Sequence, residues 1–245
     1  TLSEQLLSAR VGKDLIDHYT YVIAGDGCLM EGISHEAISM AGHLKLGKLI
    51  LFWDDNSISI DGATSLSVSD DQIKRFQASG WNTISVDGHN TAEISAAIKK
   101  AKSDPSAPWL IACKTIIGFG APNKQGTKDT HGSPLGADEI KATRENIGWP
   151  YAPFDVPAEI LNAWRAAGSR GKPARIAWEK TFAKADAAAK VLIDGRDASA
   201  ASGAAIADAK AAFAADTAKR ATRVWSQMTL ERLVPAMPEL LGGSA

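Results

Sequence analysis

The sequence predicts an α/β fold, namely a doubly wound and mostly parallel sheet, followed by a helical linker. Two observations predict the sheet. Short apolar runs of strand length recur between residues 1 and about 150, and stretches with helical periodicity separate these runs. The third observation is the alanine-rich composition of residues 158 to about 221, where few large apolar side chains are available to anchor helices. This composition predicts a loosely held helical linker.

The first three expected elements form a βαβ unit. The run from Tyr21 to Ala24 is apolar and stops at the glycine turn Gly25-Asp26-Gly27, as a buried parallel strand would. Apolar residues then recur at three- and four-residue intervals from Ser34 to Leu46, which predicts a helix that ends at Gly47. Leu49 to Trp53 predicts the second buried strand.

The later elements follow the same alternation and then leave it. Thr83 to Val86 and Leu110 to Cys113 are strand-like, and Ala92 to Lys102 is helical. Prolines in the stretch from Tyr151 to Pro157 limit helix and ladder hydrogen bonds, which predicts an extended connector. The helical linker, in which Gly195 and Gly203 interrupt the alanine runs, comes next. A new amphipathic helix is expected from Ala221.

Polar residues follow the first two expected strands, where open α/β sheets bind ligands. Asp26 and Asn56 both lie just beyond a strand's carboxyl end. Gly27 lets the backbone approach a phosphate closely. Asp26 cannot serve that phosphate directly, because two anions repel, so a divalent cation is expected between them. Mg²⁺ suits this role, with Ca²⁺ or Mn²⁺ as substitutes, and Asp26, the Asn56 amide oxygen and the Ile58 carbonyl are its expected protein ligands.

Composition excludes two other classes of protein. The 245 residues are 45% hydrophobic and 22% charged, and no apolar run approaches the roughly 20 residues needed to span a membrane. A formal charge of -1 argues against a broad nucleic-acid-binding face. The two cysteines, Cys28 and Cys113, are expected to be free core thiols in a reducing compartment. These few free thiols favour a cytoplasmic protein.

A succession of motifs covers nearly all of the chain, apart from the alanine-rich stretch. The motifs are Gly25-Asp26-Gly27-Cys28-Leu29-Met30-Glu31-Gly32, Ala41-Gly42-His43-Leu44-Lys45-Leu46-Gly47, Asp54-Asp55-Asn56-Ser57-Ile58-Ser59-Ile60-Asp61-Gly62, Gly80-Trp81, Val86-Asp87-Gly88-His89, residues 115–124, His131-Gly132-Ser133-Pro134-Leu135-Gly136, Gly148-Trp149-Pro150 and residues 238–245. In these motifs the sequence resembles the transketolase family. Other thiamine diphosphate enzymes share the first motif but seldom this succession.

The resemblance implies a thiamine-diphosphate-binding fold and a division of the chain. Residues 1–150 would be the pyrophosphate-binding domain, truncated at its N-terminus. Residues 151–220 would be the connector and helical linker, and residues 221–245 the truncated start of the pyrimidine-binding domain. The chain is therefore expected to be an internal fragment that is inactive by itself.

The resemblance also implies an activity, an assembly and cofactors. The reaction would be reversible transfer of a two-carbon ketol group from a ketose phosphate, such as xylulose 5-phosphate, to an aldose phosphate in the pentose phosphate pathway. Thiamine diphosphate and Mg²⁺ would be the cofactors. The enzyme would be a homodimer with its active sites at the subunit interface, and sugar phosphates would be its substrates.

Five further site residues follow from the resemblance alone. His131 would be catalytic, contacting the cofactor diphosphate and the donor substrate and assisting proton transfer. Arg223 would bind the substrate phosphate. Glu31 would lie at the dimer interface. Ile60 and Ile117 would clasp the thiazolium ring in an apolar wall.

Two alternative functions stay open from sequence. The chain could belong to a non-catalytic thiamine-diphosphate-binding module. It could equally belong to a related ketose-handling enzyme such as dihydroxyacetone synthase, because acceptor choice depends on residues outside this chain.

Overall fold

The structure is a computed structural model that describes residues 1–242 and divides into two compact units. The first unit comprises Thr1–Leu6 and Asp17–Pro173, and the second comprises Leu7–Ile16 and Ala174–Ala245. Residues 243–245, the last three of the expected final domain and of its motif, lie outside the described residues.

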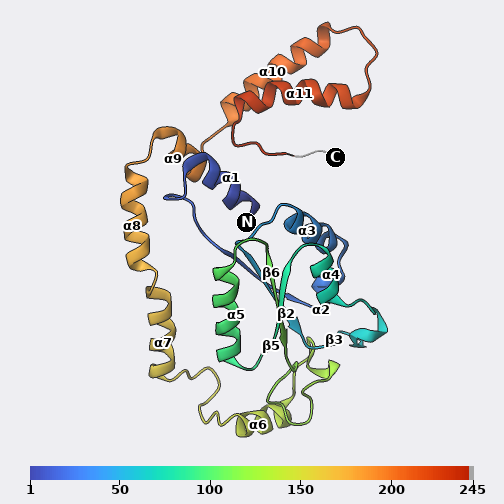
Figure 1. Ribbon diagram of the computed structural model, residues 1–245, viewed down its shortest axis with the longest axis vertical. Coiled ribbons are helices and arrows are strands. Elements are labelled where there is room, and N and C mark those ends of the chain that lie inside the picture. The colour runs from blue at the N-terminus through green and yellow to red at the C-terminus, as the bar shows by residue number, and fades with distance from the viewer. Residues whose placement is uncertain (243–245) are drawn as a thin grey trace. The chain divides into compact units, whose positions relative to one another are not determined.

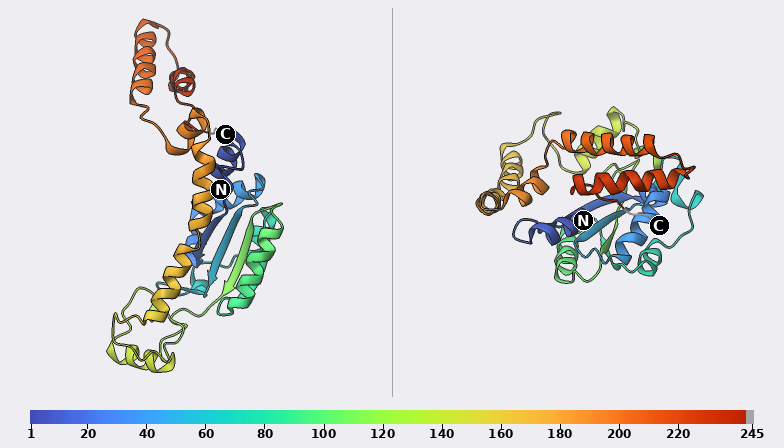
Figure 2. Two further views of the ribbon diagram at one scale, coloured as in Figure 1. Left: turned by 90° about the vertical axis from the view of Figure 1, so that its left-hand side faces the viewer. Right: turned by 90° about the horizontal axis from the view of Figure 1, so that it is seen from above.

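A four-stranded parallel sheet is the centre of the first unit (Figure 1). Its strands are β1 (Thr20–Gly25), β2 (Leu49–Asp55), β6 (Trp109–Lys114) and β5 (Asn82–Asp87), in the spatial order β1-β2-β6-β5. All neighbouring pairs are parallel. Figure 2 shows the same strands from a second direction. The four strands and the mostly parallel sheet expected from the apolar runs are confirmed.

Helices cover both faces of this sheet, as the doubly wound prediction requires. On one face α2 (Asp26–Met30), α3 (Gly32–His43) and α4 (Gln72–Ala78) contribute to a core with Leu110 and Ala112 of β6. On the other face α5 (Thr91–Ser103) packs on Trp109, Ile111 and Cys113. Successive β6 side chains therefore enter opposite cores, which explains why this strand reads as a continuous apolar run.

The first strand lies at an edge of the sheet, so the prediction that it is buried is wrong. In the described residues β1 pairs with β2 alone. The Ile23 side chain is 82% exposed, whereas Ala24 on the opposite face is buried. An apolar run is compatible with an edge or a central strand, because the local sequence does not determine which other strands pair with it.

Helix α3 ends earlier than the periodicity from Ser34 to Leu46 predicts. It stops at His43, and Lys45 then adopts a left-handed backbone conformation with φ of 50°. This turn returns the chain toward β2. Gly47 follows, where a Cβ atom would lie 1.7 Å from the Pro105 carbonyl oxygen. A tertiary contact therefore requires the glycine that sequence assigned to helix termination.

Short elements occupy the loops at the carboxyl ends of the strands. After β2 the chain forms an antiparallel hairpin of β3 (Ile58–Ser59) and β4 (Gly62–Ala63), followed by the 3-10 helix η1 (Thr64–Leu66). After β6 come the 3-10 helix η2 (Lys128–Thr130) and α6 (Ala137–Asn146). Residues 151–157 contain no helix or strand.

Helices make up the rest of the chain. They are α1 (Leu2–Val11), α7 (Ala158–Ser169), α8 (Lys172–Ala183), α9 (Ala187–Asp194), α10 (Ser199–Ala215) and α11 (Thr222–Ala236). Gly195 ends α9 with φ of 79°, whereas Gly203 lies inside α10. No helix among residues 1–242 is long and apolar enough to cross a membrane.

The last two helices pack against each other within the second unit. Phe213 of α10 meets Trp225 of α11 edge to face, with ring centroids 4.8 Å apart. Arg232 Nε donates to Asp208 Oδ2 at 2.7 Å. The helix expected from Ala221 is thus present, and it has a helical partner in the alanine-rich stretch.

Candidate functional site

Asp26 lies where β1 ends, and its carboxylate is held by the segment that follows β2. Parallel pairing places Gly25 beside Asp54, so both strands end at the same level. Trp53 Nε1 donates to Asp26 Oδ1 at 3.1 Å, and the Ser57 backbone N–H donates to Asp26 Oδ2 at 3.1 Å. The structure therefore brings Asp26 to the Asn56 loop, as the positions of the two strand ends predict.

The Asn56 loop has a constrained backbone. Ser57 adopts a left-handed conformation with φ of 64°, which is costly for a residue with a Cβ and recurs at functional sites. The Asn56 amide Nδ2 donates to Asp54 Oδ2 at 3.1 Å. Its Oδ1 accepts the Ile58 backbone N–H at 3.0 Å. Both ends of the amide are thus engaged, with the oxygen at Ile58.

Several supporting residues were missed in the sequence. The Thr115 hydroxyl, just after β6, hydrogen-bonds Asp54 Oδ1. Lys114 Nζ donates to Asp55 Oδ1 at 3.1 Å and to Ser57 Oγ at 2.8 Å. Asp54 and Asp55 directly precede Asn56 in the sequence, but their partners Lys114 and Thr115 lie 59 and 61 residues further along the chain. Only the pairing of β2 with β6 brings them together.

The environment of Asp26 disfavours its negative charge. Burial raises the pKa of the Asp26 carboxyl above its ordinary value, and the nearby charge of Asp55 acts in the same direction. Hydrogen bonds from Trp53 and Ser57 and the charge of Lys114 oppose this shift. A cation bound to the carboxylate would relieve the cost of ionising it.

The donor set fits a magnesium–diphosphate pair. Asp26 supplies a carboxylate, Asn56 an amide oxygen and Ile58 a backbone carbonyl, and Mg²⁺ completes such a set with phosphate and water oxygens. A Cβ atom built on Gly27 meets no atom within 4 Å, so open space lies beside that backbone. Within residues 1–242 no group of three or more His, Cys, Asp or Glu side chains could hold a metal. The predicted magnesium ligands differ from such a group, because they comprise one carboxylate, one side-chain amide and one backbone carbonyl.

The three other predicted cofactor contacts lie on two loops. Ile60 is at the turn between β3 and β4, and its side chain is 70% exposed. Ile117 is half-buried after β6, and its carbonyl accepts the Gly126 N–H at 2.8 Å. A Cβ atom on Gly118 would lie 2.5 Å from Thr130 Cγ2. Gly118 and Thr130 therefore lie close together, so the segment that carries the exposed His131 lies against the segment that carries Ile117.

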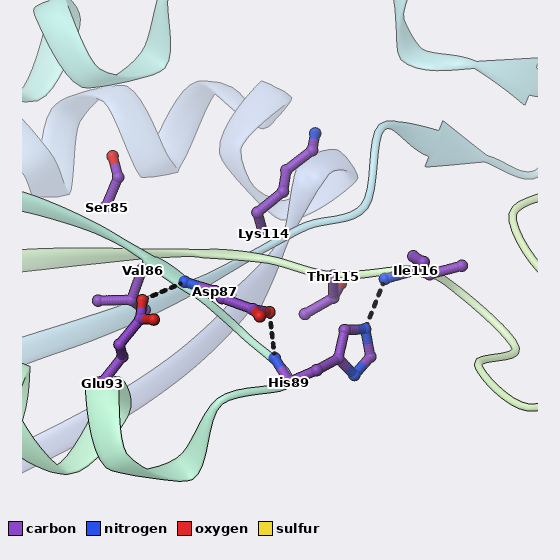
Figure 3. Close-up of a pocket in the computed structure, with 8 residues that line it drawn as sticks. All are labelled: Ser85, Val86, Asp87, His89, Glu93, Lys114, Thr115 and Ile116. Atoms are coloured by element: carbon purple, nitrogen blue, oxygen red, sulfur yellow. Dashed lines mark hydrogen bonds between the residues drawn. The ribbon is translucent and has the colours of Figure 1, made fainter.

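A pocket of about 500 Å³ opens at the carboxyl ends of β5 and β6 (Figure 3). His89 Nε2 accepts the Ile116 backbone N–H at 3.0 Å, and the His89 backbone N–H donates to Asp87 Oδ1 at 2.9 Å. The His89 ring also stacks on Phe119, with centroids 4.1 Å apart. His89 therefore fixes the loop that carries Ile117, a role that its sequence did not reveal.

Glu31 and Arg223 are both exposed. Glu31 separates α2 from α3, and its carbonyl accepts the Ser34 N–H at 3.0 Å. Arg223 lies in the first turn of α11, in the second unit. Cys28 is exposed and Cys113 buried, both as free thiols, so the expectation of a core position is confirmed for Cys113 and wrong for Cys28.

Residues 2–220 match a family model described as transketolase, thiamine diphosphate binding domain. The chain belongs to the transketolase family. Transketolase from Cereibacter sphaeroides is 53% identical over 245 residues, and transketolase 1 from Escherichia coli (strain K12) is 47% identical over 271 residues. Both alignments cover 100% of this chain, which spans only 37% and 38% of those relatives.

Solved transketolases have the same fold. A mutant transketolase from Pichia stipitis in complex with fructose 6-phosphate has a TM-score of 0.82 and 37% identity, over 99% of this chain and 37% of that one. Transketolase from Leishmania mexicana has a TM-score of 0.77 and 35% identity, over 97% of this chain and 36% of that one. The transketolase resemblance read from the motifs and the expected fold are confirmed.

Proposed function

We propose that this transketolase-family chain supplies the diphosphate and metal site of an enzyme that transfers a two-carbon ketol group. The donor would be a ketose phosphate such as xylulose 5-phosphate, and the acceptor an aldose phosphate. Family membership and the thiamine diphosphate binding domain support this function. The observation that carries it is the Asp26 carboxylate, held between Trp53 and Ser57 beside Asn56.

Asp26, the Asn56 amide oxygen and the Ile58 carbonyl would hold Mg²⁺, and the Gly27 backbone would approach the diphosphate. The raised pKa of Asp26 supports a cation at this carboxylate. The bound thiamine diphosphate would supply the chemistry that makes and breaks the carbon–carbon bond. The protein's part is to bind and orient this cofactor.

The surrounding loops would shape the reacting end of the site. Ile60 and Ile117 would pack on the thiazolium ring, and this apolar wall would limit access of water. His131 would contact the diphosphate and the donor substrate and would hold or move a proton there. The exposure of Ile60 and the contact between the Ile117 and His131 segments support these roles.

The remaining roles rest on the family. Arg223 would bind the substrate phosphate, and Glu31 would lie at the interface of a homodimer whose active sites are shared between subunits. Residues 1–150 would be the pyrophosphate-binding domain, 151–220 the connector and linker, and 221–245 the start of the pyrimidine-binding domain. The protein would act in the pentose phosphate pathway of the cytoplasm.

The cofactor site is tested by calorimetric titration of the chain with thiamine diphosphate, with and without Mg²⁺. We expect Mg²⁺-dependent binding that Asp26→Asn and Asn56→Leu each weaken at least tenfold. Asp138→Asn, which changes an exposed carboxylate in the first turn of α6, is the matched control and should bind as the parent does. Unchanged binding by both site variants would refute the metal site.

The reaction is tested in the full-length gene product that contains this chain. Transfer from xylulose 5-phosphate to ribose 5-phosphate should require thiamine diphosphate and Mg²⁺ and should be lost in Asp26→Ala. His131→Ala should lower kcat while cofactor binding remains measurable. Cofactor binding without transfer by the folded parent protein would contradict the proposed reaction and favour a binding module.

A further inference from the structure

A second and smaller pocket, of about 230 Å³, lies between the carboxyl ends of β1 and β2 and the segment from η1 to α4. Oxygen-bearing side chains dominate its lining, including Asp55, Ser65, Ser69, Asp70 and Gln72. Asp26 also lines it, but Gly27, Asn56 and Ile58 are not among its lining residues. The pocket is therefore a separate space that shares one carboxylate with the proposed diphosphate site.

Gln72 is the unusual member of this lining. It is the first residue of α4 and only 7% exposed. Its side-chain Oε1 is buried without a hydrogen-bond partner in the described structure. A buried amide oxygen without a partner costs stability, and such atoms are rare in folded proteins. A bound cation or hydrogen-bond donor would satisfy the lone pairs of this oxygen.

The charges around the pocket indicate the sign of that group. Three carboxylates, those of Asp26, Asp55 and Asp70, line the space, and no Lys, Arg or His does. Asp55 pairs with Lys114 at 3.1 Å, and Asp70 with Arg75 at 3.7 Å. Both basic residues lie outside the lining. The space therefore offers anionic and neutral oxygens, which are the ligands of hard cations.

We propose that this pocket binds a divalent metal cation of the Mg²⁺ and Ca²⁺ class, in addition to the one proposed at the diphosphate. The Gln72 amide oxygen and the Asp70 and Asp55 carboxylates are its protein ligands, and the Ser65 and Ser69 hydroxyls and water complete the shell. Gln72 carries the assignment, because it lines a space that also holds carboxylates and its buried amide oxygen has no hydrogen-bond partner. This site goes beyond the proposed function and does not depend on ketol transfer.

Terbium luminescence tests the site in the chain without thiamine diphosphate. Tb³⁺ takes oxygen ligands as Ca²⁺ does, and Trp53, which lines the pocket, can sensitise its emission. We expect two bound ions per chain. Gln72→Met removes the amide at similar side-chain length and should eliminate one ion, or weaken its binding at least fivefold. Asp70→Asn should act on the same ion, and competition by Mg²⁺ and Ca²⁺ should displace it.

Two further variants separate the two sites. Asp71→Asn changes the neighbouring carboxylate, which caps α4 and does not line the pocket, and should leave both ions bound. Asn56→Leu should remove only the ion of the diphosphate site. Circular dichroism should show that Gln72→Met folds, because the change removes an unpartnered buried polar atom. The proposal would be overturned if the parent chain bound one ion and both Gln72→Met and Asp70→Asn bound that ion as the parent does. That result would leave the proposed thiamine diphosphate site intact if the cofactor still bound.

Discussion

The indole Nε1 of Trp53 donates a hydrogen bond to the Oδ1 atom of Asp26 across 3.1 Å. Trp53 belongs to the core beneath α2, α3 and α4, whereas Asp26 is the first residue after β1. A buried side chain of one strand thus orients the carboxylate at the end of its neighbour. The core therefore helps to orient the proposed metal ligand.

Trp53→Phe removes this donor and retains an aromatic ring. The hydrogen bond lowers the pKa of Asp26, so its loss should raise that pKa further and allow protons to compete with the metal at higher pH. We expect Mg²⁺-dependent affinity for thiamine diphosphate to fall about three- to tenfold. Calorimetry across a pH series measures the effect. Trp109 lies in the other core and its indole donates to the Asp104 backbone carbonyl, so Trp109→Phe is a matched control that should leave the pH profile unchanged.

The metal-free chain should lose stability as pH rises through the folded-state pKa of Asp26. The pKa of Asp26 is raised in the folded state, so the folded chain binds a proton more tightly than the unfolded chain. The stability contribution of Asp26 is therefore lost as pH rises through the folded pKa. Asp26→Asn does not ionise, so it should lack this contribution to the pH dependence, although its amide can accept only one of the two hydrogen bonds that Trp53 and Ser57 donate to the carboxylate. Thermal melts from pH 3 to pH 8 without metal test this, and the same change of melting temperature with pH in both chains would contradict it.

Ser57→Gly should relieve backbone strain in the Asn56 loop. Glycine adopts a φ of 64° without a Cβ penalty, and we expect a gain of about 1 kcal/mol from the relaxed backbone. Ser57→Ala keeps the Cβ but loses the contact between the hydroxyl and Lys114 Nζ, so it separates the two effects. Urea unfolding measures all three chains. Equal loss of stability in Gly and Ala variants would show that the hydroxyl matters more than the backbone.

Gly42→Ala should destabilise the first unit by about 1 to 3 kcal/mol, in the range of overpacked cores. A Cβ atom at this position would lie 1.7 Å from the Ser79 carbonyl oxygen, so α3 and the segment after α4 would have to move apart. Gly32→Ala in the same helix meets no atom within 4 Å and is the matched control. Chemical denaturation should show a neutral or stabilising effect at Gly32. Similar losses at both positions would exclude the clash as the cause.

The strands and the position of the site could be predicted from sequence because both depend on local pattern. The apolar runs define β2 and β6, and the turn after Ala24 and the polar run after Trp53 mark the carboxyl ends of β1 and β2. Long-range packing decides the features that sequence missed. The exposure of Ile23 depends on whether another element covers its face of β1, and the indole bond to Asp26 depends on the register of β1 and β2. The hydroxyl of Thr115 likewise reaches Asp54 only through the pairing of β2 with β6.

The pairing of β2 with β6 also has a kinetic consequence. The chain between these adjacent strands contains α4, β5 and α5, so a long loop must close before they pair. Closure entropy is lost before the contacts form, and sheets with such distant partners fold slowly. Asp54 and Thr115 come from the two sides of that loop, so their contact should form late in folding. We expect the native ligand site to appear together with the final slow phase of refolding, after most helical structure is present.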